Sequence, residues 1–212
     1  MKKLALIGTK EFAQQIRGFI KRIGGFEFVG YLDDMVEKNT IIEGYSVLGS
    51  VSDAKYLYKQ GIIECVFIAI GYSRFDLREF YYNILKNVVP FANIIEPTAE
   101  LGENVKLGEG IYIGRNTIID DGTELKDNVF IHRNCLIGHD SIIGKHTYCS
   151  GMDHMAGFCY IGERTFIGLS VCVADHIVIG DDVWVGIGSI VAKNLKKSGK
   201  YLSQNILLTK IE

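Results

Sequence analysis

Three of the five histidines in this sequence are spaced seven residues apart, and their side chains have the widest chemical scope in the chain. They are His132, His139 and His146. A neutral imidazole can ligate a metal ion, or it can accept a proton from a reacting group near neutral pH. Which chemistry applies depends on whether the fold brings these three rings together.

The five cysteines carry less chemical information. Their number is odd and none forms a CxxC pair, so neither a complete set of intrachain disulfides nor a zinc ribbon is expected. We expect small apolar side chains that fill the core in a reducing compartment. The residues concerned are Cys65, Cys135, Cys149, Cys159 and Cys172.

The composition is that of a globular protein with one or two domains. Of its 212 residues, 48% are apolar and 23% are charged, and the net charge is −2. So small a charge argues against a dedicated nucleic-acid binder or a membrane-surface binder. The apolar run at residues 4–7 is too short for a signal peptide, and the run at 65–70 is far below a membrane span. We expect a cytoplasmic protein.

A period of six residues runs through the C-terminal half of the chain. Residues 99–194 divide into sixteen consecutive hexads without insertion, and the third residue of every hexad is apolar. The fourth residue is glycine in more than half of them. An amphipathic helix repeats its apolar face every 3.6 residues, so this period excludes a helix and predicts a parallel β-helix. We expect the third side chain to point inward and the glycine after it to permit the corner.

Three hexads complete one triangular coil in such a fold, so residues 18 apart in this sequence stack on one another. His139 then shares an edge with Gly157, whose missing side chain leaves room for the imidazole. Asp121 and Asp175 lie on the same edge. The three histidines fall on three different corners of one coil, so they cannot converge on a metal ion within one subunit.

The first 95 residues follow a different pattern. Strands are predicted at residues 4–7, 28–32 and 65–70, and helices at 12–23, 52–60 and 75–86. Strands that alternate with helices indicate a small parallel sheet with Rossmann-like topology. The sequence therefore predicts an α/β domain at residues 1–95 and an all-β domain, with a C-terminal tail, at residues 96–212.

Several segments, read in order, resemble the sugar O- and N-acetyltransferases related to the sialic-acid and bacillosamine-pathway acetyltransferases. They are LIGTKEF, GYLDD, GYSVLGS and AIGY in the first domain, then IIEPTAELGENVKLGEGIYIG, CLIGHDSIIGKHTYCS and CYIGERTFIG. The resemblance implies a Rossmann-like nucleotide-sugar-binding domain before a left-handed β-helix of hexapeptide repeats. It also implies a homotrimer with active sites between subunits.

The activity that the resemblance implies is acetyl transfer from acetyl-CoA, without a metal, to a nucleotide-linked amino sugar for surface-glycan biosynthesis. The acceptor would be the 4-amino group of a 4-amino-4,6-dideoxy sugar. His139 would be the general base and Asp140 its orienting partner. Gly157 would place a backbone N–H near the thioester, where it can stabilise the developing oxyanion. The remaining residues assigned to the coenzyme are Gly186, Gly188 and Lys193.

The resemblance also assigns a set of acceptor-binding residues, and here the sequence departs from the family. These residues are Gly8, Thr9, Lys10, Asp33, Asp34, His132 and Tyr148. The N-terminal loop has one glycine and no histidine. Tyr148 stands where the family has a second histidine, and His132 where it commonly has asparagine. Residues 204–207 replace the family's Gly-Asn-Pro-Ala ending.

Three other functions remain open on the sequence. A hydroxyl acceptor would make the protein a sugar O-acetyltransferase, for example of sialic acid. The altered loop and the missing second histidine favour a non-catalytic trimeric sugar-binding or scaffold protein. Left-handed β-helices also include zinc carbonic anhydrases, but these lack the Rossmann-like domain.

Overall fold

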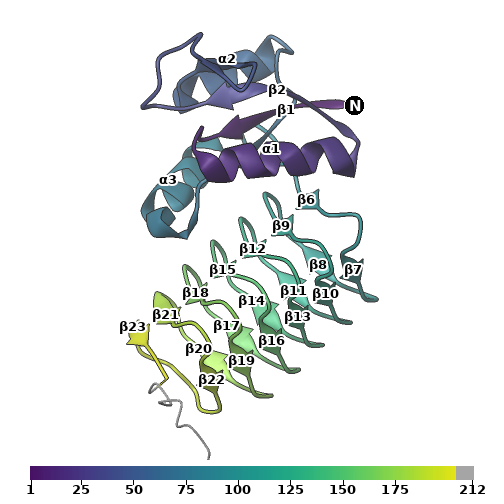
Figure 1. Cartoon of the computed structure of the whole chain (residues 1–212), viewed down its shortest axis with the longest axis vertical. Helices are drawn as coiled ribbons and strands as arrows, with labels where there is room; N and C mark the ends of the chain where they lie inside the picture. The colour runs from purple at the N-terminus through teal and green to yellow at the C-terminus, as the bar shows by residue number, and fades with distance from the viewer. Residues whose placement is uncertain (204–212) are drawn as a thin grey trace, which may run out of the picture.

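The computed structural model describes residues 1–203, so the predicted departure at residues 204–207 lies outside the described part. Figure 1 shows a small α/β unit lying along one side of a β-helix. Within the described residues, no helix has the length and apolar character that crossing a bilayer requires.

The N-terminal unit is a five-stranded sheet with strand order β3-β4-β2-β1-β5, in which only β3 is antiparallel to its neighbour. Its strands are β1 Lys2–Ile7, β2 Phe26–Leu32, β3 Ile41–Ile42, β4 Tyr45–Gly49 and β5 Cys65–Ile68. Its helices are α1 Glu11–Ile23, α2 Ala54–Lys59 and α3 Phe75–Leu85, with 3₁₀ turns η1 Val51–Asp53 and η2 Tyr72–Arg74. The predicted strands and helices are confirmed; the hairpin β3–β4 was missed.

Helices cover both faces of this sheet. On one face, α1 buries Ala13, Ile16 and Ile20 against the strands, as its apolar spacing predicts. On the other face, Leu57 of α2 and Leu85 of α3 are buried in a second cluster. Figure 1 shows α1 between the sheet and the β-helix, α2 on the far side of the sheet, and α3 to one side, near the β-helix.

The β-helix is built from short strands in three parallel sheets. The first sheet contains β7 Glu100–Leu101, β10 Ile118–Ile119, β13 Leu136–Ile137, β16 His154–Met155, β19 Cys172–Val173 and β22 Ile190–Val191. The second contains β8 Lys106–Leu107, β11 Glu124–Leu125, β14 Ile142–Ile143, β17 Tyr160–Ile161 and β20 Val178–Ile179. The third contains β6 Ile94–Ile95, β9 Tyr112–Ile113, β12 Phe130–Ile131, β15 Tyr148–Cys149, β18 Phe166–Ile167, β21 Val183–Val185 and β23 Gly199–Tyr201.

The register confirms the predicted stacking of residues 18 apart, since Ile119 pairs with Ile137, and Ile137 with Met155. Third-position side chains are buried in every hexad after the first two. At the N-terminal end, Leu101 remains 39% exposed. Strand β6 already pairs with β9, so the β-helix begins within the range predicted for the first domain.

The fourth-position glycine does not form the corner, and that prediction was wrong. A Cβ at Gly138 would lie 2.6 Å from the backbone of Ala156 in the next coil, so this glycine permits close stacking of coils. The left-handed corner residue is the sixth of each hexad, which has a positive φ in fifteen of the sixteen hexads. Asparagine and glycine tolerate that conformation best, and residues such as Asn104, Asn116 and Gly122 occupy it.

An aromatic ladder joins the two units. It consists of the outward side chains of five successive strands of the third sheet, Tyr112, Phe130, Tyr148, Phe166 and Trp184. The Phe130 and Tyr148 rings stack with their centroids 5.7 Å apart. Phe12 and Phe19 of α1 contact the ladder, so the N-terminal unit packs against this face of the β-helix.

Four of the five cysteines are buried, in accord with the prediction. Cys172 is the exception, because its side chain points outward from the first sheet and is exposed. Burial raises the pKa of Cys65 to about 11 and that of Cys135 to about 12, as expected for unreactive core thiols.

Candidate active site

His139 lies on the first corner of the β-helix, which joins the first sheet to the second and comprises residues 138–141 in its coil. Its Nδ1 is 3.0 Å from Oδ2 of Asp140, and the two side chains are 51% and 54% exposed. Asp140 is the sixth residue of its hexad and has a φ of 54°. The repeat therefore holds an imidazole and a carboxylate together in an accessible position.

Both side chains lie over a glycine of a neighbouring coil. A Cβ at Gly157 would lie 2.6 Å from Nε2 of His139, and a Cβ at Gly122 would lie 2.7 Å from Oδ1 of Asp140. Gly157 follows His139 by one coil, and Gly122 precedes Asp140 by one coil. Sequence reasoning found Gly157 and missed Gly122, although the same 18-residue spacing identifies it.

The backbone N–H of Gly157 has no acceptor among the described residues. On either side of it, Ala156 donates to the carbonyl of Val173, and Phe158 donates to the carbonyl of His139. The first corner thus presents an unused donor next to Nε2 of an accessible imidazole. A base and a hydrogen-bond donor on one edge can remove a proton from a nucleophile and stabilise the oxyanion that its attack creates.

Two further rings extend the corner. Phe158 meets His139 edge to face, with centroids 4.9 Å apart and planes at 83°. His176 stacks on the other side of Phe158 at 4.8 Å. Sequence reasoning missed both residues, which are the sixth residues of the next two hexads on this corner.

Tyr148 belongs to the aromatic ladder and His132 lies beside it, so neither residue is on the first corner. Nε2 of His132 and the hydroxyl of Tyr148 are 2.7 Å apart, and the His132 ring contacts Phe12 and Tyr112. Burial lowers the pKa of His132 to about 4, and burial raises that of Tyr148 above its usual range. The two predicted acceptor residues are neighbours, but the structure brings neither to His139 within one subunit.

His146 lies on the second corner, which joins the second sheet to the third at residues 144–147. Its Nδ1 is 2.9 Å from Nδ2 of Asn128, and its ring meets Tyr82 of α3 edge to face. Burial lowers its pKa to about 4. The three histidines thus occupy three different corners, and residues 1–203 contain no group of three or more His, Cys, Asp or Glu side chains arranged to hold a metal ion.

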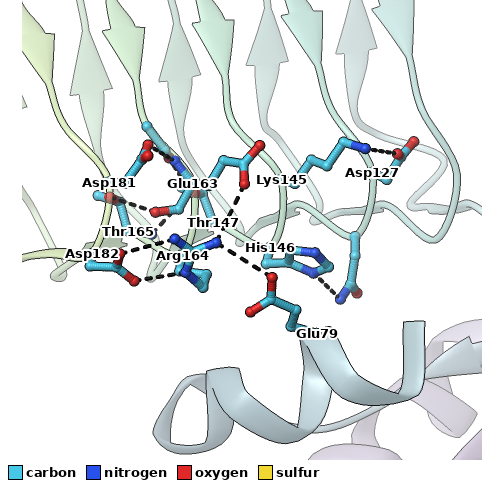
Figure 2. A network of polar contacts seen from close by, with 12 residues as sticks. Glu79, Asp127, Lys145, His146, Thr147, Glu163, Arg164, Thr165, Asp181 and Asp182 are labelled. Carbon is cyan, nitrogen blue, oxygen red and sulfur yellow. Dashed lines mark hydrogen bonds and ion pairs between the residues drawn. The ribbon is translucent and has the colours of Figure 1, made fainter. Parts of the chain in front are cut away.

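The second corner is occupied by ion pairs that connect it to α3. Figure 2 shows Arg164 between Asp182 of the next coil and Glu79 of α3. Nε of Arg164 is 2.7 Å from Asp182, and Nη1 is 3.4 Å from Glu79. These contacts pair the polar groups of the second corner with one another and with the N-terminal unit.

The predicted N-terminal loop lies at the carboxyl end of β1, between β2 and β5. Thr9 donates a hydrogen bond to Asp33 at 2.7 Å, and Gly8 has a φ of 103° with the carbonyl of Ala69 nearby. Lys10 is exposed at the start of α1. In open α/β sheets, ligands bind at the carboxyl ends of the strands, at the point where the strand order reverses. Here that point is β1, because β2 follows it on one side and β5 lies on the other.

Asp34 is held by its own chain. Its Oδ1 accepts the N–H of Val51 at 2.7 Å, and its Oδ2 accepts the hydroxyl of Tyr81 at 2.9 Å. Asp33 also accepts the N–H of Met35. The structure therefore gathers Gly8, Thr9 and Asp33 at one edge and uses Asp34 to hold the neighbouring elements.

The predicted coenzyme residues divide between two corners. Lys193 is exposed and occupies the fifth position on the first corner, in the same column as His139 and Gly157. Gly186 and Gly188 lie on the third corner, which joins the third sheet to the first. Gly186 contacts Leu202, whereas Gly188 has open space where a Cβ would lie.

Comparison with known proteins identifies the N-terminal unit and the overall fold. Residues 3–83 match the family model of the PglD N-terminal domain. No curated protein sequence matches the chain. A mutant of GDP-perosamine N-acetyl transferase from Caulobacter crescentus, solved with CoA and GDP-perosamine, is 25% identical, with a TM-score of 0.86 over 96% of this chain and 94% of that chain.

Two more solved structures share the fold at lower identity. The acetyltransferase domain of PglB from Neisseria gonorrhoeae, solved with acetyl coenzyme A, is 20% identical, with a TM-score of 0.83 over 95% of this chain and 96% of that one. WeeI from Acinetobacter baumannii is 18% identical, with a TM-score of 0.60 over 91% and 95%. The predicted architecture, an N-terminal α/β domain before a left-handed β-helix, and the predicted family resemblance are confirmed.

Proposed function

We infer that this chain belongs to the hexapeptide-repeat sugar acetyltransferases that carry a PglD-type N-terminal domain, and that it takes its acetyl group from acetyl-CoA. We propose that the acceptor is the 4-amino group of a nucleotide-linked 4-amino-4,6-dideoxy sugar used in surface-glycan biosynthesis. One observation carries this proposal: Nε2 of His139 lies against Gly157, whose N–H lacks an acceptor among the described residues.

Each group on the first corner has a role in this reaction. Acetyl-CoA supplies the acyl group as an activated thioester. Nε2 of His139 accepts the proton that the amine loses as its nitrogen bonds to the thioester carbon. The Gly157 N–H donates to the carbonyl oxygen as negative charge develops there. His139 then returns the proton to the sulfur as the carbon–sulfur bond breaks, which yields the amide and the free thiol.

Asp140 supports the base. Its carboxylate, 3.0 Å from Nδ1, fixes the tautomer that leaves Nε2 free to accept a proton. It also stabilises the imidazolium that forms during the reaction. No covalent acyl-enzyme is needed, because the acceptor attacks the thioester directly.

Lys193 favours coenzyme binding along the first corner. It lies three coils beyond His139 in the same column, which is roughly 14 Å at the usual spacing of neighbouring strands. A cation at that distance suits the phosphates of a coenzyme whose thioester end lies at Gly157. Gly186 and Gly188 are on another corner, so their proposed contacts with the coenzyme come from a neighbouring subunit.

We propose a homotrimer with its active sites between subunits. Exposed apolar side chains on the third corner and the adjoining first sheet support this assembly. Ile187 is 71% exposed and Ile190 is 77% exposed. Surfaces of this kind mark protein–protein contacts when they are contiguous.

We propose that the nucleotide binds at the carboxyl edge of the N-terminal sheet, near Gly8, Thr9 and Lys10. The start of a 13-residue helix and an exposed lysine attract phosphate there. Asp33 lies at the same edge. Asp34, His132 and Tyr148 make contacts within the chain, and we propose that they shape the acceptor site. Both substrates are cytoplasmic metabolites, which favours action in the cytoplasm.

The deciding experiment is a thiol-release assay with acetyl-CoA and UDP-, dTDP- and GDP-linked 4-amino sugars, with sialic acid included. The wild type should release thiol with one amino sugar. His139→Asn should lower kcat by about 10²- to 10⁴-fold, the usual contribution of a general base, without lowering Tm because the side chain is exposed. The exposed His154 of β16 gives the control His154→Asn, which should keep full turnover.

Three outcomes would change the assignment. Thiol release with sialic acid alone would make the protein an O-acetyltransferase. Equal turnover by wild type and His139→Asn would remove the proposed base. A protein that neither releases thiol nor binds the coenzyme would be a non-catalytic sugar-binding or scaffold protein.

A further inference from the structure

Phe158 contacts the proposed base through both its side chain and its backbone. Its ring meets the imidazole of His139 edge to face, with centroids 4.9 Å apart. Its backbone N–H donates to the carbonyl oxygen of His139 at 2.9 Å. On its other side it stacks on His176 at 4.8 Å, with the planes 4° apart. The Phe158 ring therefore separates two imidazoles on one edge of the β-helix.

Neither the backbone nor burial accounts for a phenylalanine at this position. Phe158 has a φ of 59°, in the left-handed region that a bulky side chain rarely occupies. The residue is 49% exposed. At the same position on this corner, two other coils have Asn104 and Gly122, which suit that conformation. An unfavourable backbone state at an exposed residue indicates that the side chain is kept for its contacts.

Other large sixth-position residues show what such contacts do. His146 and Arg164, also with positive φ, lie on the second corner and contact Tyr82 and Glu79 of α3. Their side chains hold the N-terminal unit in place. Phe158 lies on the first corner, where no element of the described residues covers it, and its ring contacts are with His139 and His176.

We propose that Phe158 is a positioning residue, whose ring holds the His139 imidazole over Gly157. This inference rests on the proposed function of His139. The hydrogen bond from Nδ1 to Asp140 fixes one point of the ring, and an exposed side chain held at one point still changes rotamer on a fast timescale. The edge-to-face contact supplies a second fixed point, so that Nε2 stays where the acceptor needs it.

The test replaces Phe158 with the residue that the backbone prefers. Phe158→Asn should not lower Tm, because asparagine suits a positive φ, but it should lower kcat by roughly 10- to 100-fold, the scale of a small misplacement of a catalytic group. KM for acetyl-CoA and for the sugar should change much less than kcat. Phe158→Tyr keeps the ring and should restore turnover.

Met152 provides a matched control. It is the sixth residue of the preceding hexad, with a φ of 56° and 50% exposure, but it lies on the third corner. Met152→Asn should change Tm in the same direction as Phe158→Asn and leave kcat unchanged. The pair separates the effect of the backbone position from the effect of the ring.

The outcomes distinguish this inference from the proposed function. Full kcat in Phe158→Asn, with His139→Asn inactive, would overturn the positioning role and leave the base in place. Full kcat in both variants would overturn the proposed function itself. If Phe158→Asn dissociates the oligomer in sedimentation, Phe158 is an interface residue and the positioning role is also overturned.

Discussion

The first and second corners of the β-helix carry histidines from consecutive hexads in opposite settings. His139 on the first corner is half exposed, bonded to a carboxylate, and lies over Gly157. His146 on the second corner is 2% exposed, bonded to the amide of Asn128, and covered by Tyr82 of α3. The backbone is nearly the same at both corners, because the sixth residues Asp140 and His146 have φ of 54° and 63°.

The two corners differ in whether the N-terminal unit covers them. On the second corner, α3 lies across the coils, and the polar side chains are paired with one another or with that helix (Figure 2). On the first corner no element of the described chain lies across them, and the side chains of His139 and Asp140 stay about half exposed. A repeat that makes every corner alike thus yields one corner that packs against the N-terminal unit and another that stays accessible, according to where the N-terminal unit lies.

The largest expected effect comes from filling the space beneath His139. In Gly157→Ala the new Cβ would lie 2.6 Å from Nε2, too close for both to stay. The imidazole is exposed and will move before the stacked coil does. We expect kcat to fall about 10²- to 10³-fold, as when a base or oxyanion donor is displaced, with Tm changed little.

Gly18→Ala in α1 is the control, because apart from the adjoining backbone of its own helix no atom lies within 4 Å of its Cβ position. Alanine is the better helix former, so this variant should gain about 0.5 to 1 kcal/mol of stability and keep full kcat. Unchanged turnover in Gly157→Ala would show that Nε2 does not need its position over Gly157 to accept the proton.

The sequence predicted the β-helix because its inward position is invariantly apolar, but it misassigned the corner. The glycines at the fourth position are more frequent than those at the sixth, although only the sixth position has the left-handed backbone. The signal was present in Asn104, Asn116 and Asn128. Hairpin β3–β4 was missed because β3 has only two residues, too few for a periodic pattern.

The candidate site was predictable wherever the 18-residue spacing applies. That spacing identified Gly157 next to His139, and it would equally have identified Gly122. It could not identify Tyr82 as a partner of His146. Tyr82 belongs to α3, and the position of α3 against the β-helix depends on contacts between distant parts of the chain. The aromatic ladder, at the second position of every third hexad from Tyr112 to Trp184, was the available sign of which face is covered.

A smaller effect distinguishes the buried histidine from the exposed one by pH. Burial holds the pKa of His146 at about 4 in the folded chain, against 6.5 when it is unfolded. Below pH 6.5 the unfolded state takes up a proton that the folded state refuses, so the free energy of unfolding falls as pH decreases toward 4. The loss reaches up to about 3 kcal/mol at pH 4.

His146→Asn removes this contribution and keeps a residue suited to the positive φ. We expect urea unfolding between pH 7.5 and pH 4.5 to show a shallower loss of stability in the variant than in the wild type. His132, whose pKa is lowered in the same direction, is present in both proteins and cancels in the comparison. Parallel pH profiles would mean that His146 is not sealed beneath α3.

The smallest effect concerns the ion pairs of the second corner. Arg164→Met removes the contacts with Asp182 and Glu79, whose side chains are 53% and 36% exposed. Because these partners are partly solvated, we expect a loss of only about 1 kcal/mol in the free energy of unfolding. That loss should shrink as salt screens the charges, and kcat should not change.

Arg74→Met is the matched control, since its pair with Asp76 lies within the N-terminal unit and is more exposed. It should leave stability unchanged at any salt concentration. If Arg164→Met also lowers kcat, the packing of α3 on the second corner is coupled to the proposed base on the first corner. The packing at the second corner would then affect turnover at the first, and the two corners would not be independent.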